Sequence, residues 1–216
     1  LYILTSLISL PAFTWLIRTT TPALLLAIPV IFAPEIRRGL ERIGRAGSGQ
    51  LVNHQDQPAV EALHQMINVV VTAAARLSSR QHGALIILQR SDSLREYVNT
   101  GIQLNARVTS ELLLQIFYPN TPLHDGAVII ANNTIIAASC VMPLSASGIL
   151  NRSAERRMGL RHRAALGISE ASDAIAVVVS EETGAIAIAH NGRIIRRLDS
   201  ERLENILLTF YQTSQT

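Results

Sequence analysis

Residues 174–189 read AIAVVVSEETGAIAIA, and this stretch decides the fold class. Two short apolar runs, Ala174–Val179 and Ala185–Ala189, flank the polar segment Ser180–Gly184. Apolar runs of this length that are bounded by turn formers are typical of buried β-strands. We therefore expect two neighbouring strands joined by a turn that carries two carboxylates.

Similar apolar runs recur on both sides of this stretch, and they alternate with segments of helical periodicity. This alternation predicts an α/β domain in which helices flank a mixed central sheet. The expected strands are Ala84–Leu88, Ala127–Ala131, Thr134–Met142, Ala174–Val179, Ala185–Ala189 and Arg193–Leu198. The expected helices are Pro58–Ser79, Ser93–Val98, Ser110–Phe117, Glu155–Leu166 and Ser200–Gln212.

The first 34 residues are strongly apolar and contain a single charge, Arg18. A helix that spans a membrane needs about 20 apolar residues, so the stretch before Arg18 is marginal and the stretch after it is short. We expect one or more N-terminal transmembrane helices over residues 1–34, with buried core helices as the alternative. The chain begins with Leu rather than Met, which leaves open that residues precede it.

Arginines follow the apolar segment directly, and they predict a cytoplasmic location for the residues after them, with an ordinary solvated helix face as the alternative. These arginines are Arg37, Arg38, Arg42 and Arg45. We expect residues 35–57 to form a juxtamembrane helix and a linker, since the segment from Gly44 onward is rich in Gly, Ser, Asn and Gln. Residues 58–216 then form the main domain.

Composition excludes several classes of protein. The net charge is +3, which is too small for a general nucleic-acid-binding surface. Aromatic residues make up 4% of the chain, which argues against stacking platforms for single strands. Cys140 is the only cysteine, so no intramolecular disulfide can form, and its apolar strand favours a place in the core over a nucleophilic role.

The segment Asn120–Ala127, NTPLHDGA, is the first candidate for a catalytic or ligand-binding site. Gly126 and Ala127 lack bulky side chains, so a ligand can approach the backbone beside the carboxylate of Asp125. Such a carboxylate could hold ribose hydroxyls, bind a metal or accept a proton. An ordinary turn is the alternative, because Asp-Gly is a common turn dipeptide.

The segment Arg156–Arg163, RRMGLRHR, is the second candidate. Arginines and backbone amides near the start of a helix suit phosphate oxygens, and Gly159 is a residue at which the helix could break. His162 lies between two arginines, so we expect it to stay neutral, with a nitrogen free for a metal or a phosphate proton. A solvated basic helix is the alternative.

The segment Ser180–Gly184 is the third candidate, because its carboxylates follow an apolar strand directly. Such carboxylates could hold a divalent cation, as a polyphosphate substrate requires, and a charged hairpin turn is the alternative. Together the three segments carry the groups needed for phosphoryl or nucleotidyl transfer. The sequence has no P-loop, no G-x-G-x-x-G and no nucleophile elbow.

The chain resembles the diadenylate cyclases, in particular their membrane-anchored class. The segment from Gly101, GIQLNARVTSELLLQIFYPNTPLHDGAVII, is similar to the part of the family that carries its DGA motif. RHRAALGISEASDA from Arg161 and VVVSEETGAIAIAHNGRI from Val177 are similar to two further family segments. APEIRRGLERIGR from Ala33 resembles the junction between the membrane helices and the catalytic domain.

The resemblance implies the diadenylate cyclase fold and the synthesis of cyclic di-AMP from two ATP molecules, with release of two pyrophosphates. The two sites face each other in a homodimer, and a divalent cation, Mn²⁺, Co²⁺ or Mg²⁺, is required. The resemblance also implies a bacterial cell membrane protein with a cytoplasmic catalytic domain. A membrane or cytoplasmic protein partner is expected to regulate it, and no nucleic acid is expected to bind.

The resemblance also implies roles for individual residues. Asp125 lies near the ribose and the attacking 3′-hydroxyl, and Glu182 ligates the metal together with His162. The phosphates are held by Arg161, His162, Arg163 and Ser180. The nucleotide is lined by Gly126 and Ala127, and its adenine packs against Met142 and Leu144.

Two features depart from the family pattern. Leu160 stands where the family usually has Thr, which removes a hydroxyl near the phosphates, and residues 145–157 form a longer loop than usual. These departures keep a second hypothesis open, a catalytically silent membrane sensor that binds ATP or a cyclic dinucleotide. The DNA-scanning branch of the family fits less well, because its helical spine and DNA-binding module have no counterpart after the last expected helix.

Overall fold

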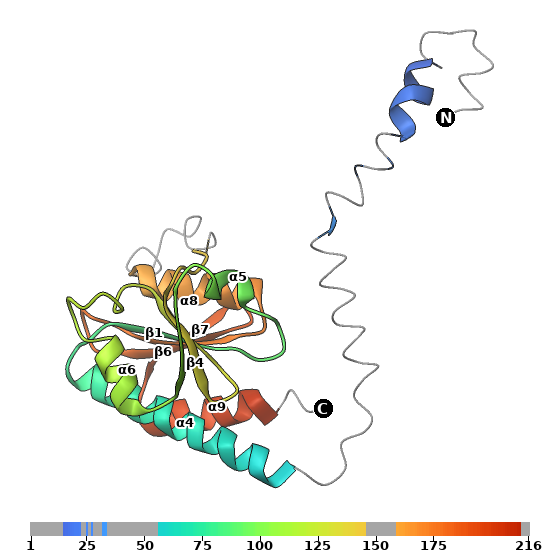
Figure 1. Cartoon of the computed structure of the whole chain (residues 1–216). Helices are drawn as coiled ribbons and strands as arrows, with labels where there is room; N and C mark the ends of the chain where they lie inside the picture. Colours follow the sequence, from blue (N-terminus) through green and yellow to red (C-terminus); the bar gives the residue numbers. More distant parts are fainter. Residues whose placement is uncertain are drawn as a thin grey trace. The chain divides into compact units, whose positions relative to one another are not determined.

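The protein folds around a seven-stranded sheet with the order β2-β4-β3-β1-β5-β6-β7 (Figure 1). The computed structural model describes residues 56–145 and 159–212, together with residues 15–22, 25, 27, 32 and 33. The strands are β1 (Ala84–Leu88), β2 (Ile102–Arg107), β3 (Ala127–Ala131), β4 (Thr134–Cys140), β5 (Ile175–Val179), β6 (Ile186–His190) and β7 (Arg193–Leu198). Only β1 and β3 pair in parallel, and the other neighbours are antiparallel. The predicted mixed sheet is confirmed.

Helices cover both faces of the sheet (Figure 1). The helices of the main domain are α4 (Asp56–Ser79), α5 (Arg95–Val98), α6 (Ser110–Ile116), α8 (Leu160–Ala171) and α9 (Ser200–Gln212). Helix α4 packs against α6 and α9 on one face, while α8 lies on the other face over β5 and β6. The arrangement is a three-layer α/β/α sandwich, as the alternation of apolar runs predicted.

The sheet separates two hydrophobic cores, because successive side chains of a strand point to opposite faces. In β1, Ile86 and Leu88 belong to the core under α4, whereas Leu85 and Ile87 belong to the core under α8. The core under α8 is rich in alanine, so this helix approaches the sheet closely. A Cβ added at Gly167 of α8 would lie 2.1 Å from the carbonyl oxygen of Pro143.

Strand β2 is an element that the apolar runs did not predict. It lies at one edge of the sheet, and most of its side chains are exposed. Its sequence, IQLNAR, therefore lacks the apolar run that identifies a buried strand. Asn105 adopts a positive φ of 48°, and the register with β4 shifts between Gln103 and Ala106. A bulge of this kind is a common way to protect a sheet edge from further pairing.

The helix predicted over Glu155–Leu166 is confirmed from Leu160 to Leu166, whereas residues 155–158 lie outside the described residues. Helix α8 begins at Leu160, because Gly159 before it has an extended conformation, and it continues to Ala171. The expected break at Gly159 is thus the true start of the helix. Smaller differences affect β4, which ends at Cys140 rather than Met142, and α5, which begins at Arg95 rather than Ser93.

The chain divides into two units, Leu1–Gln55 and Asp56–Thr216. In the first unit, residues 15–22 are helical, and the hydroxyls of Thr20 and Thr21 donate to carbonyls one turn earlier. Among the positions whose placement is described, no helix has the length and apolarity needed to cross a membrane. The transmembrane segments predicted over residues 1–34, and the linker over 35–57, lie largely outside the described residues.

Candidate functional site

Three segments that are distant in the sequence meet at one end of the central strands. Because β1 is parallel to β3 and antiparallel to β5, the starts of β1 and β3 lie beside the end of β5. Asp125 precedes β3, Gly83 precedes β1, and Ser180 follows β5. The first turn of α8 carries Arg161 and lies at the same end, because the Arg161 side chain contacts His124 and Glu181. The sheet and the start of α8 therefore bring Asp125, Arg161 and the segment Ser180–Gly184 together, while residues 156–158 of the second predicted motif lie outside the described residues.

Arg161 connects these segments directly. Its Nη2 atom donates to the carbonyl oxygen of His124 at 3.4 Å, and its Nη1 atom forms an ion pair with the Oε2 atom of Glu181. The Arg161 side chain is 19% exposed, so a large part of it is shielded from water. A Cβ added at Gly83 would lie 2.7 Å from Arg161 Nη1 and 2.8 Å from Glu181 Oε2. The ion pair therefore packs over a position that only glycine leaves open.

The loop before β3 exposes the carboxylate of Asp125. The backbone of this loop is fixed, because the Ser139 hydroxyl donates to the carbonyl oxygen of Asp125 at 2.7 Å. Gly126 has a φ of +104°, and a Cβ there would lie 2.8 Å from the carbonyl carbon of Ser139. Ala127 is buried at the start of β3. Within residues 56–145 and 159–212 the Asp125 carboxylate has no hydrogen bond or ion pair, so it is free to act on a ligand.

Burial lowers the pKa of His162 below its ordinary value of 6.5, and the nearby charge of Arg196 lowers it further. The carboxylate of Glu182 acts in the opposite direction. The prediction that this imidazole resists protonation agrees with the direction of the shift, but the cause differs. Burial and an arginine from β7 keep it neutral, rather than the two arginines beside it in the sequence.

The neutral His162 imidazole and the Glu182 carboxylate are chemically suited to a divalent cation. The described part of the chain contains no cluster of three or more His, Cys, Asp or Glu side chains that could hold a metal alone. A cation here would complete its coordination with substrate oxygens and water, as is usual for Mg²⁺ at phosphate sites. The residues present therefore fit a metal that arrives with a polyphosphate.

The turn between β5 and β6 is a tight hairpin. The Ser180 amide donates to the Ala185 carbonyl at 3.0 Å, and the Thr183 amide donates to the Ser180 hydroxyl oxygen at 3.3 Å. Both glutamates of the turn are exposed. Glu181 was predicted only as one of two possible cation ligands, but it takes the ion pair with Arg161 and so leaves Glu182 available.

The segment after β4 presents apolar surface next to α8. Leu144 is 49% exposed, whereas Met142 is buried in the core under α8, so of the two expected adenine contacts only Leu144 offers much surface. Val141 is also exposed and was not predicted, although alternation along the strand places it opposite Met142. The Ser145 amide donates to the Arg163 carbonyl at 3.0 Å, which ties this segment to the helix.

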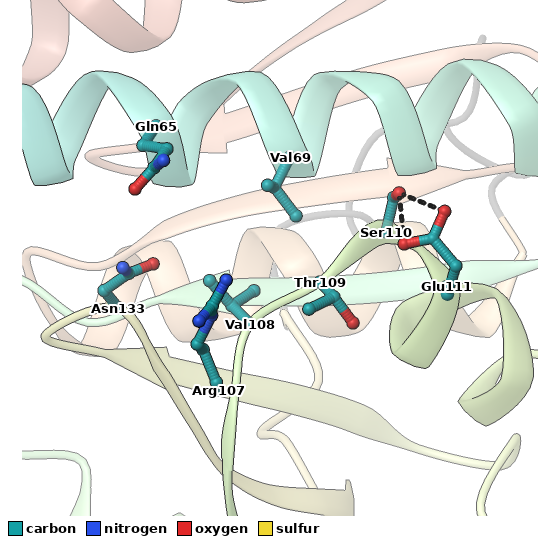
Figure 2. A pocket seen from close by; sticks show the side chains of 8 residues that line it. All are labelled: Gln65, Val69, Arg107, Val108, Thr109, Ser110, Glu111 and Asn133. Carbon is teal, nitrogen blue, oxygen red and sulfur yellow. Dashed lines mark hydrogen bonds between the residues drawn. The ribbon is translucent and has the colours of Figure 1, made fainter.

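A separate pocket of about 180 Å³ lies at the opposite end of the sheet, where β3 ends (Figure 2). It lies between α4 and the junction of β2 with α6, and the Ser110 hydroxyl at its rim donates to the Glu111 carboxylate at 3.0 Å. Its lining residues are Gln65, Val69, Arg107, Val108, Thr109, Ser110, Glu111 and Asn133. None of the predicted site residues contributes to it.

The fold and the site define an α/β domain with carboxylates, an arginine and a histidine gathered at one end of its sheet. The chain belongs to the DAC family, the DisA bacterial checkpoint controller nucleotide-binding family, whose model matches residues 71–194. The family resemblance seen in the sequence is thereby confirmed.

Relatives of known activity share most of the chain. It is 44% identical over 200 residues to the cyclic di-AMP synthase CdaA of Bacillus subtilis, which covers 93% of this chain and 71% of that protein. It is 45% identical over 183 residues to a diadenylate cyclase of Listeria monocytogenes, which covers 85% of this chain and 64% of the relative. The chain thus spans about two thirds of these relatives' length.

Two solved structures also match this chain. A double mutant of DacA from Staphylococcus aureus matches with a TM-score of 0.64 and 40% identity, over 68% of this chain and 95% of that one. A structure described as a hypothetical membrane spanning protein from Bacillus cereus matches with a TM-score of 0.56 and 45% identity, over 61% of this chain and 62% of that one. Both matches show that this chain shares its fold, as well as its sequence, with these proteins.

Proposed function

We propose that the chain is a diadenylate cyclase, which joins two ATP molecules into cyclic di-AMP. The observation that carries the proposal is the meeting of Asp125, Arg161 and the hairpin Ser180–Gly184 at one end of the sheet. Membership of the DAC family and the activities of the relatives support it.

The reaction has two equivalent steps. In each, the 3′-hydroxyl oxygen of one ATP forms a bond to the α-phosphorus of the other, and the bond between that phosphorus and the bridging oxygen breaks. The electron pair leaves with pyrophosphate, and the hydroxyl loses its proton. Asp125 is placed to position the hydroxyl and to accept this proton, because its carboxylate is exposed beside a loop with little side-chain bulk.

Arginines at the start of α8 bind the phosphates. The Nε atom of Arg161 is buried and has no partner in the described part of the chain, and a phosphate oxygen would satisfy it. His162, Arg163 and Ser180 supply further polar groups at the same end of the sheet. Gly126, Ala127 and Leu144 line the nucleoside, while Met142 supports this surface from the core.

Glu182 and His162 hold the divalent cation, Mn²⁺, Co²⁺ or Mg²⁺, whose charge, when bound, offsets that of the phosphates. The imidazole meets the requirement that a histidine ligand be neutral, since its pKa is lowered. The carboxylate is exposed and unpaired among the residues described around it.

A homodimer explains how two ATP molecules meet. One site holds one ATP and offers no second 3′-hydroxyl in line with its α-phosphorus. Two copies that face each other across a two-fold axis would supply that orientation. We further propose that residues 1–34 anchor the protein in the cell membrane, that residues 35–57 link this anchor to a cytoplasmic catalytic domain over 58–216, and that a membrane or cytoplasmic protein regulates it.

Incubation of the purified full chain with ATP and Mn²⁺ tests the activity, with cyclic di-AMP and pyrophosphate measured together. We expect one cyclic dinucleotide for every two pyrophosphates. Tight ATP binding without any product would reject the cyclase and favour the silent sensor. That alternative is supported by Leu160, which is 68% exposed and places an apolar side chain where the family usually has a hydroxyl.

A further inference from the structure

Arg196 comes from β7, an edge strand that none of the three motifs includes. The register of β6 and β7 pairs Ala187 with Arg196 and Ala189 with Ile194. Ala187 and Ala189 belong to the core under α8, and the partly buried Ile194 packs against it. Arg196 is therefore on the face of the sheet that α8 covers.

Arg196 also lies at the end of the sheet where Asp125, Arg161 and the hairpin Ser180–Gly184 meet. Strand β6 starts where the hairpin Ser180–Gly184 ends, and antiparallel pairing brings the last residues of β7 alongside that start. Helix α8, whose first turn carries Arg161 and His162, contacts β7 as well as β5 and β6. Arg196 is exposed and has no ion pair or hydrogen bond within the described segments.

Arg161 contributes little free positive charge to the site. Arg161 is neutralised by its ion pair with Glu181, and Glu182 adds a further negative charge at this end of the sheet. The triphosphate of ATP carries several negative charges, and more charge develops on the bridging oxygen as the bond to the α-phosphorus breaks. An unpaired guanidinium beside these phosphates would stabilise both states through charge-assisted hydrogen bonds.

We propose that Arg196 binds the β- and γ-phosphates of ATP and stabilises pyrophosphate as it leaves. The proposal rests on the diadenylate cyclase activity proposed above. The two terminal phosphates are thereby assigned to a residue of the edge strand, while Arg161 and Arg163 bind the α-phosphate.

The product provides the sharpest test, because cyclic di-AMP lacks the β- and γ-phosphates. The affinities of the full chain for ATP, inorganic pyrophosphate and cyclic di-AMP are measured with Mn²⁺ present, for the wild type and for Arg196→Ala. In Arg196→Ala we expect the affinity for ATP and for pyrophosphate to fall about tenfold, which corresponds to the lower end of the free energies measured for hydrogen bonds to charged groups. The affinity for cyclic di-AMP should stay unchanged. Arg196→Lys should restore part of the loss.

Arg193→Ala is the matched control, since Arg193 is exposed on the same strand but lies at its other end, opposite His190. Unchanged ATP affinity in Arg196→Ala would overturn the proposal. So would an equal loss for cyclic di-AMP, or an equal loss in Arg193→Ala, because either would indicate a general effect on the site or on surface charge. Turnover by the wild type is recorded in the same experiment, so a failure of the cyclase activity itself is seen separately.

Discussion

Gly83→Ala is expected to weaken ATP binding strongly while it leaves the fold nearly intact. The added Cβ would lie 2.7 Å from Arg161 Nη1 and 2.8 Å from Glu181 Oε2, and both of these atoms are at the ends of flexible side chains. The side chains can move away, so the backbone need not shift. What is lost is the placement of the Arg161 guanidinium.

The size of each effect follows from these contacts. A hydrogen bond to a charged group is worth about 1.5–3 kcal/mol, so ATP affinity should fall about tenfold to a hundredfold. The ion pair contributes little to stability, because Glu181 is 64% exposed, and partly exposed pairs are worth about 0–1 kcal/mol. For a domain of this size we expect the melting temperature to fall by no more than about 4 °C.

Isothermal titration with ATP and thermal unfolding, both on the full chain, measure the two quantities. Gly159→Ala is the matched control, since a Cβ there meets no atom within 4 Å. The reasoning would be refuted if Gly83→Ala bound ATP as tightly as the wild type, because Arg161 would then not be holding phosphate from its present position. A large loss of stability without loss of affinity would refute it equally.

Three further changes test other parts of the structure. Asp125→Asn should abolish cyclic di-AMP formation without changing the melting temperature, because the carboxylate is exposed and unpaired in the described structure; retained turnover would remove Asp125 from the mechanism. Gly167→Ala should destabilise the fold by about 1–3 kcal/mol, since the new Cβ would meet the Pro143 backbone at 2.1 Å, and an unchanged denaturant midpoint would contradict this close approach. Burial raises the pKa of the Cys140 thiol to about 11, so little thiolate exists at pH 8 and alkylation should wait for unfolding; rapid labelling of the folded chain would show that the thiol is accessible.

The comparison of sequence and structure shows what local pattern can predict. Strands β1, β3 and β5 were predicted because each is a short apolar run buried on both faces of the sheet. Helix α4 was predicted because its buried positions recur at steps of three and four residues. Strand β2 was missed because an exposed edge strand has no such run. The start of α8 was expected too early, because arginines are good helix formers on both sides of Gly159, whereas the helix begins only after it.

By itself the sequence determined the α/β class, the three polar motifs and the family, since burial and short motifs leave a local signal in the chain. Only the tertiary structure decided the order of the strands, the ion pair of Arg161 with Glu181 over Gly83, and the pairing that brings Arg196 to the same end of the sheet. These depend on pairings between segments far apart in the chain. The periodicity of one segment records how deeply it is buried and carries no information about which other segment will lie next to it.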